Sequence, residues 1–318
     1  GWEGQDYNEM TDPFTPQLRA IDAVNPDDFG IREALENGVT TIMTGPGSAN
    51  VVGGESMVIK TTGKTIDDMV LKNPAGIKAA FGENPKRVYN EQKKLPTTRM
   101  GIAAVMRENL MKAQDYLAKK EKAQKDNEPF DRDIKMESLI RVIKKELPLK
   151  VHAHRADDIM TVIRIAREFD IDITLEHCTE GHKVADEIAE AGIPAIVGPS
   201  MTGRVKVELS ELSFKTAGVL AKAGVKIALM SDHPVIPTKN ATIYAALAIK
   251  GGLDEKEALK AITINPAEIL GVDDRVGSIE EGKDADLIIF KGHPLEISSE
   301  VKKVIVNGQV VKKEEDGK

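Results

Sequence analysis

Two histidines separated by one residue, His152 and His154, are the sharpest candidates for chemistry in this chain of 318 residues. They end a short apolar run, residues 149–154, that predicts a β-strand. Alternate residues of a strand point to the same side, so both imidazoles can face one site. Imidazole suits zinc because its neutral ring offers a nitrogen lone pair near pH 7. Taken alone, the pair fits equally well two hydrogen-bonded histidines at a strand end.

Other polar residues come at or just after the ends of further predicted strands: His177, Asp232 and Glu83. Each alone is typical of a structural histidine, a helix cap or a turn carboxylate. Together these ordinary interpretations become improbable, because the carboxyl ends of parallel strands gather at one edge of a sheet or barrel. Imidazoles and carboxylates are the ligands of a hydrolytic divalent metal that keeps one position open for water.

An alternation of predicted strands and helices would position these residues. The predicted strands are residues 39–43, 56–60, 76–81, 149–154, 171–177, 193–197 and 225–231. A helix capped by Asn25 and Pro26 is predicted before the first strand, and helices are predicted after the later strands, one of them over residues 156–169. Short apolar strands that are each followed by a helix indicate parallel βαβ units, in an open sheet or in a closed barrel. Metal-type ligands on four separate strands favour the barrel.

The remaining segments predict simpler structure. Residues 1–16 are rich in turn residues and predict a loop. Residues 99–147 predict charged helices, broken at residues 127–129, that form an exposed excursion from the barrel. Asn265 and Pro266 are predicted to cap a short helix, and residues 304–311 predict a hairpin around the Asn-Gly turn at 307–308. The predicted domains are a barrel over residues 1–262 and a helix with a β-sandwich portion over 263–318.

Composition excludes several classes of function. The chain has 44 Lys and Arg against 51 Asp and Glu, and this acidic balance argues against a nucleic-acid partner. Its single cysteine, Cys178, excludes an intrachain disulfide and a Cys-based zinc site. No apolar run reaches the roughly 18 residues that span a bilayer, so no membrane partner is expected. We expect a cytosolic homo-oligomer that acts on a small molecule.

Two long segments resemble a known family. They are residues 263–271 (TINPAEILG) and 277–288 (GSIEEGKDADLI), which look like the closing part of the metal-dependent amidohydrolase superfamily. The order VHAH at 151–154, LEH at 175–177 and SDH at 231–233 resembles its fifth, sixth and eighth barrel strands, most closely those of the imidazolonepropionase-related amidohydrolases. The resemblance implies a (β/α)₈ barrel with a β-sandwich, and hydrolysis of amide or related C–N bonds with one or two divalent ions, for which zinc is expected.

The resemblance also implies roles for single residues. His152 and His177 correspond to metal ligands, and Asp232 to both a ligand and the general base for the metal-bound water. Glu83 falls where many members place a bridging or second-site ligand, with Lys78 on the same strand as the competitor.

Further candidates are implied at the mouth of the barrel. They are His154, His182, Arg204 and His233, which are expected to orient the substrate or the developing oxyanion.

One departure from the family is serious, because the first barrel strand with its His-x-His pair is not present. We therefore expect strands two to eight only, in a fragment or in a chain completed by another polypeptide. The edges at residues 39–43 and 225–231 would then carry unpaired backbone groups, which invite aggregation. The alternative to a working amidohydrolase is an incomplete, non-catalytic barrel that serves as a binding or assembly module.

Overall fold

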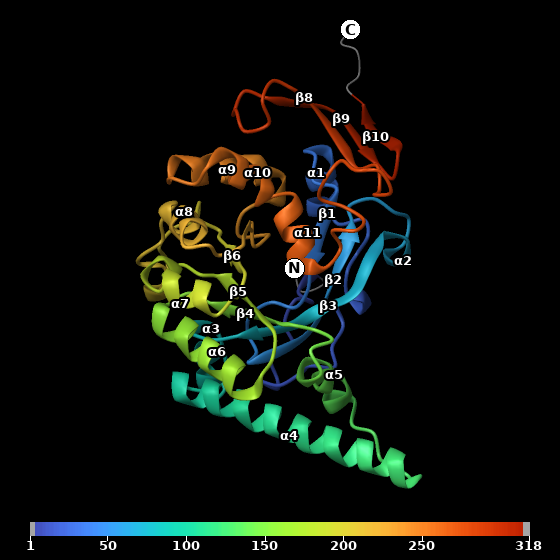
Figure 1. Cartoon of the computed structure of the whole chain (residues 1–318), viewed down its shortest axis with the longest axis vertical. Coiled ribbons are helices and arrows are strands. Elements are labelled where there is room, and N and C mark those ends of the chain that lie inside the picture. Colours follow the sequence, from blue (N-terminus) through green and yellow to red (C-terminus); the bar gives the residue numbers. More distant parts are fainter. Residues whose placement is uncertain (1–3, 314–318) are drawn as a thin grey trace. The chain divides into compact units, whose positions relative to one another are not determined.

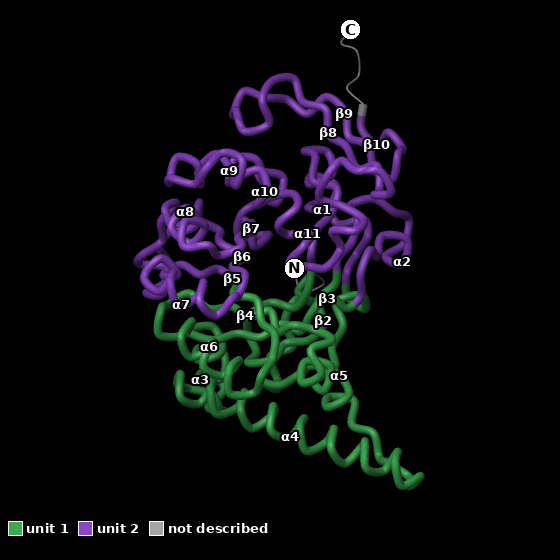
Figure 2. Tube along the Cα trace, viewed as in Figure 1, with its two compact units in different colours: residues 1–23, 44–57, 74–176 green, residues 24–43, 58–73, 177–318 purple. Residues whose placement is uncertain are grey.

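The computed structural model describes residues 4–313 and has a mixed α/β fold (Figure 1). A seven-stranded sheet has the order β1-β2-β3-β4-β5-β6-β7, and a separate three-stranded sheet has the order β10-β9-β8. The chain divides by its internal contacts into two compact units (Figure 2). Unit 1 comprises residues 1–23, 44–57 and 74–176, and unit 2 comprises residues 24–43, 58–73 and 177–318.

The strands agree well in number and position with those predicted. They are β1 (Thr41–Thr44), β2 (Val52–Lys60), β3 (Val70–Ala80), β4 (Leu149–Ala153), β5 (Ile173–His177), β6 (Ala195–Val197), β7 (Ile227–Leu229), β8 (Leu287–Lys291), β9 (Glu300–Val306) and β10 (Gln309–Lys313). No helix separates β1 from β2, whereas a helix follows each of the strands β3 to β7.

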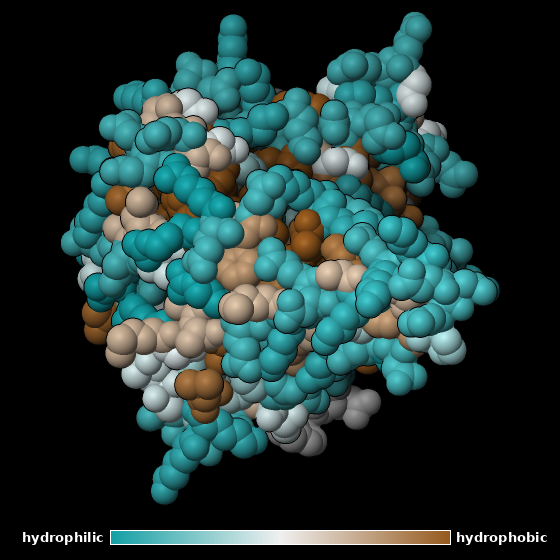
Figure 3. Space-filling view, turned by 60° about the horizontal axis from the view of Figure 1, so that its bottom comes forward, coloured by the Kyte–Doolittle hydropathy of each residue, from teal (hydrophilic) through white to brown (hydrophobic). Residues whose placement is uncertain are grey.

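The helices lie mainly after β3. They are α1 (Phe29–Glu36), α2 (Ile66–Met69), α3 (Glu83–Glu91), α4 (Arg99–Asp126), α5 (Ile134–Ile143), α6 (Ala156–Phe169), α7 (Ala185–Glu190), α8 (Lys215–Lys222), α9 (Ala241–Lys250), α10 (Glu255–Lys260) and α11 (Ile264–Leu270), with short 3₁₀ turns η2 (Ala20–Asp22), η3 (Gly181–Lys183), η4 (Val207–Leu209) and η5 (Thr238–Asn240). No helix within residues 4–313 combines the length and the apolar character needed to cross a membrane. Hydrophilic side chains predominate on the face drawn in Figure 3, where hydrophobic ones form separate areas.

In unit 1, β3 and β4 pair in parallel, with Lys78 opposite Lys150 and Ala80 opposite His152. The helical excursion predicted after β3 is present. In its first helix, α4, most of the buried residues lie before Ala113, for example Met106 and Leu110, and after Ala113 only Ala123 is buried. The predicted break is at Asn127, whose left-handed backbone (φ 54°) ends the helix.

The start of the chain is irregular over residues 4–13, as predicted, while residues 1–3 lie outside the described part. It is more than a loop, however, because its backbone pairs with β2. Thr15 donates to the Val52 carbonyl at 2.9 Å, and Glu55 donates to the Leu18 carbonyl at 2.7 Å. Isolated parallel bridges join Phe14 to Val52 and Arg19 to Glu55 in the same stretch. This segment therefore covers the first half of β2.

In unit 2, the predicted unpaired edge at residues 225–231 has partners. The Leu229 amide donates to the Ala261 carbonyl at 2.9 Å, and the buried Asn265 side chain donates to the Ile227 carbonyl at 2.9 Å. The prediction of Asn265 as a helix cap is therefore wrong, since α11 begins at Ile264, after the N-cap Thr263. Instead of capping the helix, the Asn265 side chain satisfies a backbone carbonyl at the edge of the sheet.

The first helix also starts later than predicted. Asn25 and Pro26 do not cap α1, which begins at Phe29. The Asp28 carboxylate accepts from the Gly30 amide at 2.7 Å and serves as the N-cap. The hairpin prediction is confirmed at the other end of the chain, where Asn307 and Gly308 join β9 to β10. Both have positive φ (51° and 75°), as a type I′ turn requires.

A charge network around the buried Lys60 ties β2 to the segment before β8 within unit 2. Lys60 Nζ lies 2.6 Å from Asp286 Oδ2 and 3.0 Å from Asp284 Oδ2. Arg275 donates to both oxygens of Asp284, at 2.7 and 2.9 Å. Burial alone would raise the pKa of Asp284, but the hydrogen bonds from Arg275 and Lys60 outweigh it and hold the pKa below its usual range.

Replacing Asp284 with asparagine is expected to lower the free energy of unfolding by about 2 kcal/mol at pH 7, because charge-assisted hydrogen bonds are lost. A carboxylate with a depressed pKa stabilises the fold above its unfolded pKa of about 3.9, and that stabilisation is lost as pH falls through the folded pKa. The difference between the two proteins in urea unfolding should therefore shrink below about pH 4. Asp273→Asn, at an exposed neighbour, is the control. An equal difference at pH 7 and pH 3 would contradict this account.

Candidate metal centre

Three buried histidines come together on β4 and β5. His152 lies within β4, His154 follows its last residue, and His177 is the last residue of β5. One ring nitrogen from each forms a group whose members all lie within 4.8 Å of one another. The three residues are only 3%, 5% and 2% exposed. This is the only such group of potential metal ligands among residues 4–313.

The strand geometry explains the first two positions. His152 and His154 are two residues apart, so their side chains leave the same face of the sheet. Their rings meet edge to face, with centroids 4.6 Å apart and an interplanar angle of 85°. The residue opposite His152 on β3 is the small Ala80. The predicted shared orientation of the pair is thus confirmed.

His177 is oriented by its backbone and by one hydrogen bond. Its φ of 75° breaks the regular alternation at the end of β5. Its Nδ1 lies 2.8 Å from the carbonyl oxygen of Gly198, just beyond β6. A carbonyl oxygen only accepts, so Nδ1 carries the proton and Nε2 carries the lone pair. A histidine that donates its other N–H to a carbonyl is typical of metal ligands.

The donor set fits a divalent transition ion. Three neutral imidazoles are ligands for zinc and leave a fourth position for water or substrate. The group contains no carboxylate or thiolate ligand. Three neutral imidazoles would therefore leave the positive charge of a bound ion unchanged. Burial keeps bulk water away from the ligands, which strengthens electrostatic interactions at the site.

The two predicted carboxylate ligands do not belong to this three-histidine group. Glu83 is the first residue of α3 and is partly buried. Asp232 is exposed, with a φ of 52°, shortly after β7 ends. Their predicted roles as second-site ligand and general base stay predictions.

The predicted substrate-binding residues outside the group occupy separate positions in unit 2. His182, in η3, lies 3.2 Å from the hydroxyl of Thr216 through Nδ1. Arg204 is exposed and donates to the Leu212 carbonyl at 3.1 Å. His233 is exposed beside α1, where a Cβ on Gly30 would come within 2.6 Å of its Nε2. Their roles towards a substrate also stay predictions, as does the substrate-orienting role of His154.

A buried ion pair in unit 1 was missed by the sequence analysis. Lys78 of β3 donates to Glu176 of β5, and these residues are 8% and 2% exposed. Lys150 is 1% exposed and lies opposite Lys78 in the pairing of β3 with β4. The aliphatic part of the Lys150 side chain lies against Gly76, and a Cβ at Gly76 would come within 2.9 Å of it. The signal was the presence of charged residues in apolar strands, because such residues are rarely buried unless they are paired.

Known proteins similar to the chain are amidohydrolases and related enzymes. It is 50% identical to an amidohydrolase from Thermotoga maritima MSB8 of known crystal structure, with a TM-score of 0.96 over 99% of this chain and 82% of that one. It is 27% identical to the amidohydrolase tasK of Hapsidospora irregularis over 95% of this chain and 33% of the relative. It is 37% identical to an imidazolonepropionase of Thermoplasma volcanium over 31% of this chain and 26% of the relative.

The chain thus spans about a third or less of the length of these two curated relatives. The amidohydrolase family pattern, in contrast, matches residues 28–311, which is most of the chain. The resemblance suggested by residues 263–271 and 277–288 is confirmed: the chain belongs to the amidohydrolase family.

Proposed function

We propose that this chain is a metal-dependent hydrolase that cleaves a C–N bond of a small amide or cyclic amide. The observation that carries the proposal is the group of three buried histidines, His152, His154 and His177, with ring nitrogens within 4.8 Å of one another. The amidohydrolase of Thermotoga maritima, 50% identical over nearly the whole chain, supports it. We also propose the barrel arrangement, the small-molecule substrate, the cytosolic location and the homo-oligomer expected from the sequence.

In this proposal the three histidines hold the ion, and zinc is the metal that fits them best. When bound, a divalent ion supplies Lewis acidity towards the amide carbonyl and makes water a nucleophile near neutral pH. Asp232 accepts the proton of the attacking water and passes it to the leaving nitrogen. Glu83 would serve as a bridging or second-site ligand.

Metal analysis combined with activity tests this proposal. The purified chain should retain about one zinc per molecule after dialysis, and should hydrolyse at least one member of a panel of N-acyl amino acids, dipeptides and cyclic amides. Removal of zinc with a chelator should abolish hydrolysis, and added zinc should restore it. A chain without bound metal and without hydrolysis would instead favour the non-catalytic binding module.

Replacing Asp232 with asparagine is expected to lower kcat by about 10²–10⁴-fold, the usual range for loss of a positioned base. The side chain keeps its size but loses the ability to accept a proton. Asp232 is exposed, so the free energy of unfolding should change by less than about 0.5 kcal/mol. Unchanged turnover with bound zinc would remove Asp232 from the reaction and leave the histidine site intact.

A further inference from the structure

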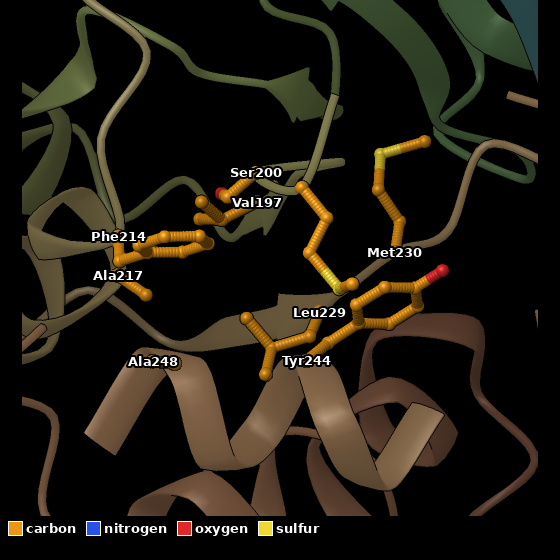
Figure 4. A pocket seen from close by; sticks show the side chains of 9 residues that line it. Val197, Ser200, Phe214, Ala217, Leu229, Met230, Tyr244 and Ala248 are labelled. Carbon is orange, nitrogen blue, oxygen red and sulfur yellow. The ribbon is translucent and has the colours of Figure 1, made fainter. Parts of the chain in front are cut away.

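A pocket of apolar side chains lies where β6 and β7 end, within unit 2 (Figure 4). The space around its lining that no atoms fill is about 310 Å³, a volume that includes the solvent at its open side. Its lining includes the last residues of both strands, a neighbouring loop and α9: Val197, Met201, Phe214, Leu229, Met230 and Tyr244. Ala217 and Ala248, which are 2% and 4% exposed, form its buried part, whereas Met201 is 37% exposed at its rim.

The chemistry of this lining selects an uncharged occupant. No charged side chain lines the pocket, and Ser200 adds one hydroxyl. The hydroxyl of Tyr244 already donates to the Pro237 carbonyl at 3.1 Å, and burial raises the pKa of Tyr244 to about 12, so it stays neutral. A charged group placed here would lose its hydration without compensation. The two methionine side chains adapt readily to apolar groups of different shape.

The pocket adjoins one member of the histidine group. Gly198 lies in the chain between the lining residues Val197 and Ser200. Its carbonyl accepts from His177 Nδ1 at 2.8 Å, and its amide lies 3.4 Å from the His177 carbonyl. The backbone that orients this histidine therefore belongs to the same short segment, residues 197–200, that contributes Val197 and Ser200 to the pocket lining.

We infer that the pocket binds an uncharged apolar side chain, of about the size of leucine or methionine, next to the amide that the metal site hydrolyses. This inference rests on the proposed function. It narrows the substrate from small amides in general to amides that carry such a side chain. The pocket would then determine which substrate side chain is accepted, through apolar contacts and without a charged residue.

The kinetic test compares zinc-loaded chain acting on N-acetyl-leucine, N-acetyl-glycine and N-acetyl-glutamate. The value of kcat/KM for the leucine compound should exceed that for each other compound by about tenfold or more, the discrimination that an apolar pocket supplies. Ala248→Leu fills the pocket and should remove this preference while zinc content and the rate on the glycine compound stay within twofold. Val219→Leu, on the more exposed part of α8, is the matched control and should change nothing. Met201→Trp fills the pocket from its rim and replaces Ala248→Leu if that variant does not fold.

A binding measurement separates failure of the inference from failure of the proposed function. Saturation-transfer NMR should detect binding of N-acetyl-leucinamide to the wild-type chain. N-acetyl-glycinamide should bind the wild-type chain at least tenfold more weakly. The Ala248→Leu variant should bind N-acetyl-leucinamide at least tenfold more weakly than the wild-type chain does. This result without any hydrolysis would retain the pocket and reject the proposed reaction. Hydrolysis at equal rates for all three side chains, or no detectable binding of the leucine compound, would overturn the inference.

Discussion

Replacement of His152 with alanine is expected to lower zinc content from about one per chain to below a tenth, and to lower hydrolysis by at least about a thousandfold. The residue is 3% exposed, and its ring lies within the group of three histidines. Loss of one of three imidazoles leaves two, and the affinity for the ion falls steeply because each protein ligand contributes to binding. Metal content by mass spectrometry and turnover measured on the same sample check the result.

The control is His293→Ala, at a histidine of unit 2 that pairs with Glu255 at 3.5 Å and is 42% exposed. It should leave both zinc content and turnover unchanged. Rescue is a second check, since excess zinc should restore part of the activity of the His152 variant by mass action. If His152→Ala keeps full zinc occupancy, His152 is not a ligand and the three-histidine site is wrong.

Replacement of Glu176 with glutamine is expected to lower the free energy of unfolding by about 3–5 kcal/mol, because it leaves buried charge uncompensated. Glu176 accepts from Lys78, and Lys150 is buried on the strand between them. The substitution keeps the shape of the side chain and removes only its charge. Urea unfolding followed by circular dichroism measures the difference.

An exposed ion pair provides the matched comparison. Glu168 pairs with Arg107 at 2.8 Å, and its side chain is 45% exposed. Glu168→Gln should cost less than about 1 kcal/mol, because water screens such pairs. Equal effects of the two substitutions would show that burial does not decide the cost of losing the carboxylate in this protein.

The sequence predicted the fold where local patterns are strong. The seven strands of the sheet were found because each is a short apolar run that ends at glycine or polar residues. Helix α6 was predicted with both ends correct, and the hairpin at Asn307 and Gly308 was predicted from its two turn residues. These features depend on residues that are close in the sequence.

Features that depend on distant residues were missed. The pairing of residues 13–18 with β2 uses backbone groups, which carry no pattern in the side chains. Asn265 next to a proline is typical of a helix cap, and only the position of the Ile227 carbonyl gives its side chain another partner. The resemblance implied a substrate-binding role for His154, and only the folded chain shows that its ring nitrogen lies within 4.8 Å of those of His152 and His177.

The candidate site shows the same division. Spacing and strand ends were sufficient to single out His152 and His177, which lie in the histidine group. The pair of Lys78 and Glu176 joins strands that are 98 residues apart in the sequence, so no local pattern reveals it. Charged residues inside apolar strands indicate that such a pair exists, but not which residues form it.

The network around Lys60 bears on how the chain folds during synthesis. Lys60 is separated by 226 residues from Asp286, with which it forms its shortest ion pair. While a ribosome makes residues 61–283, the lysine has neither aspartate available and would bury an uncompensated ammonium if β2 packed at once. At typical rates of about 5–20 residues per second, this interval lasts about ten seconds or more. The C-terminal half of β2 therefore packs late, after Asp284 and Asp286 have been synthesised. A nascent chain halted before residue 284 should remain sensitive to protease in the C-terminal half of β2.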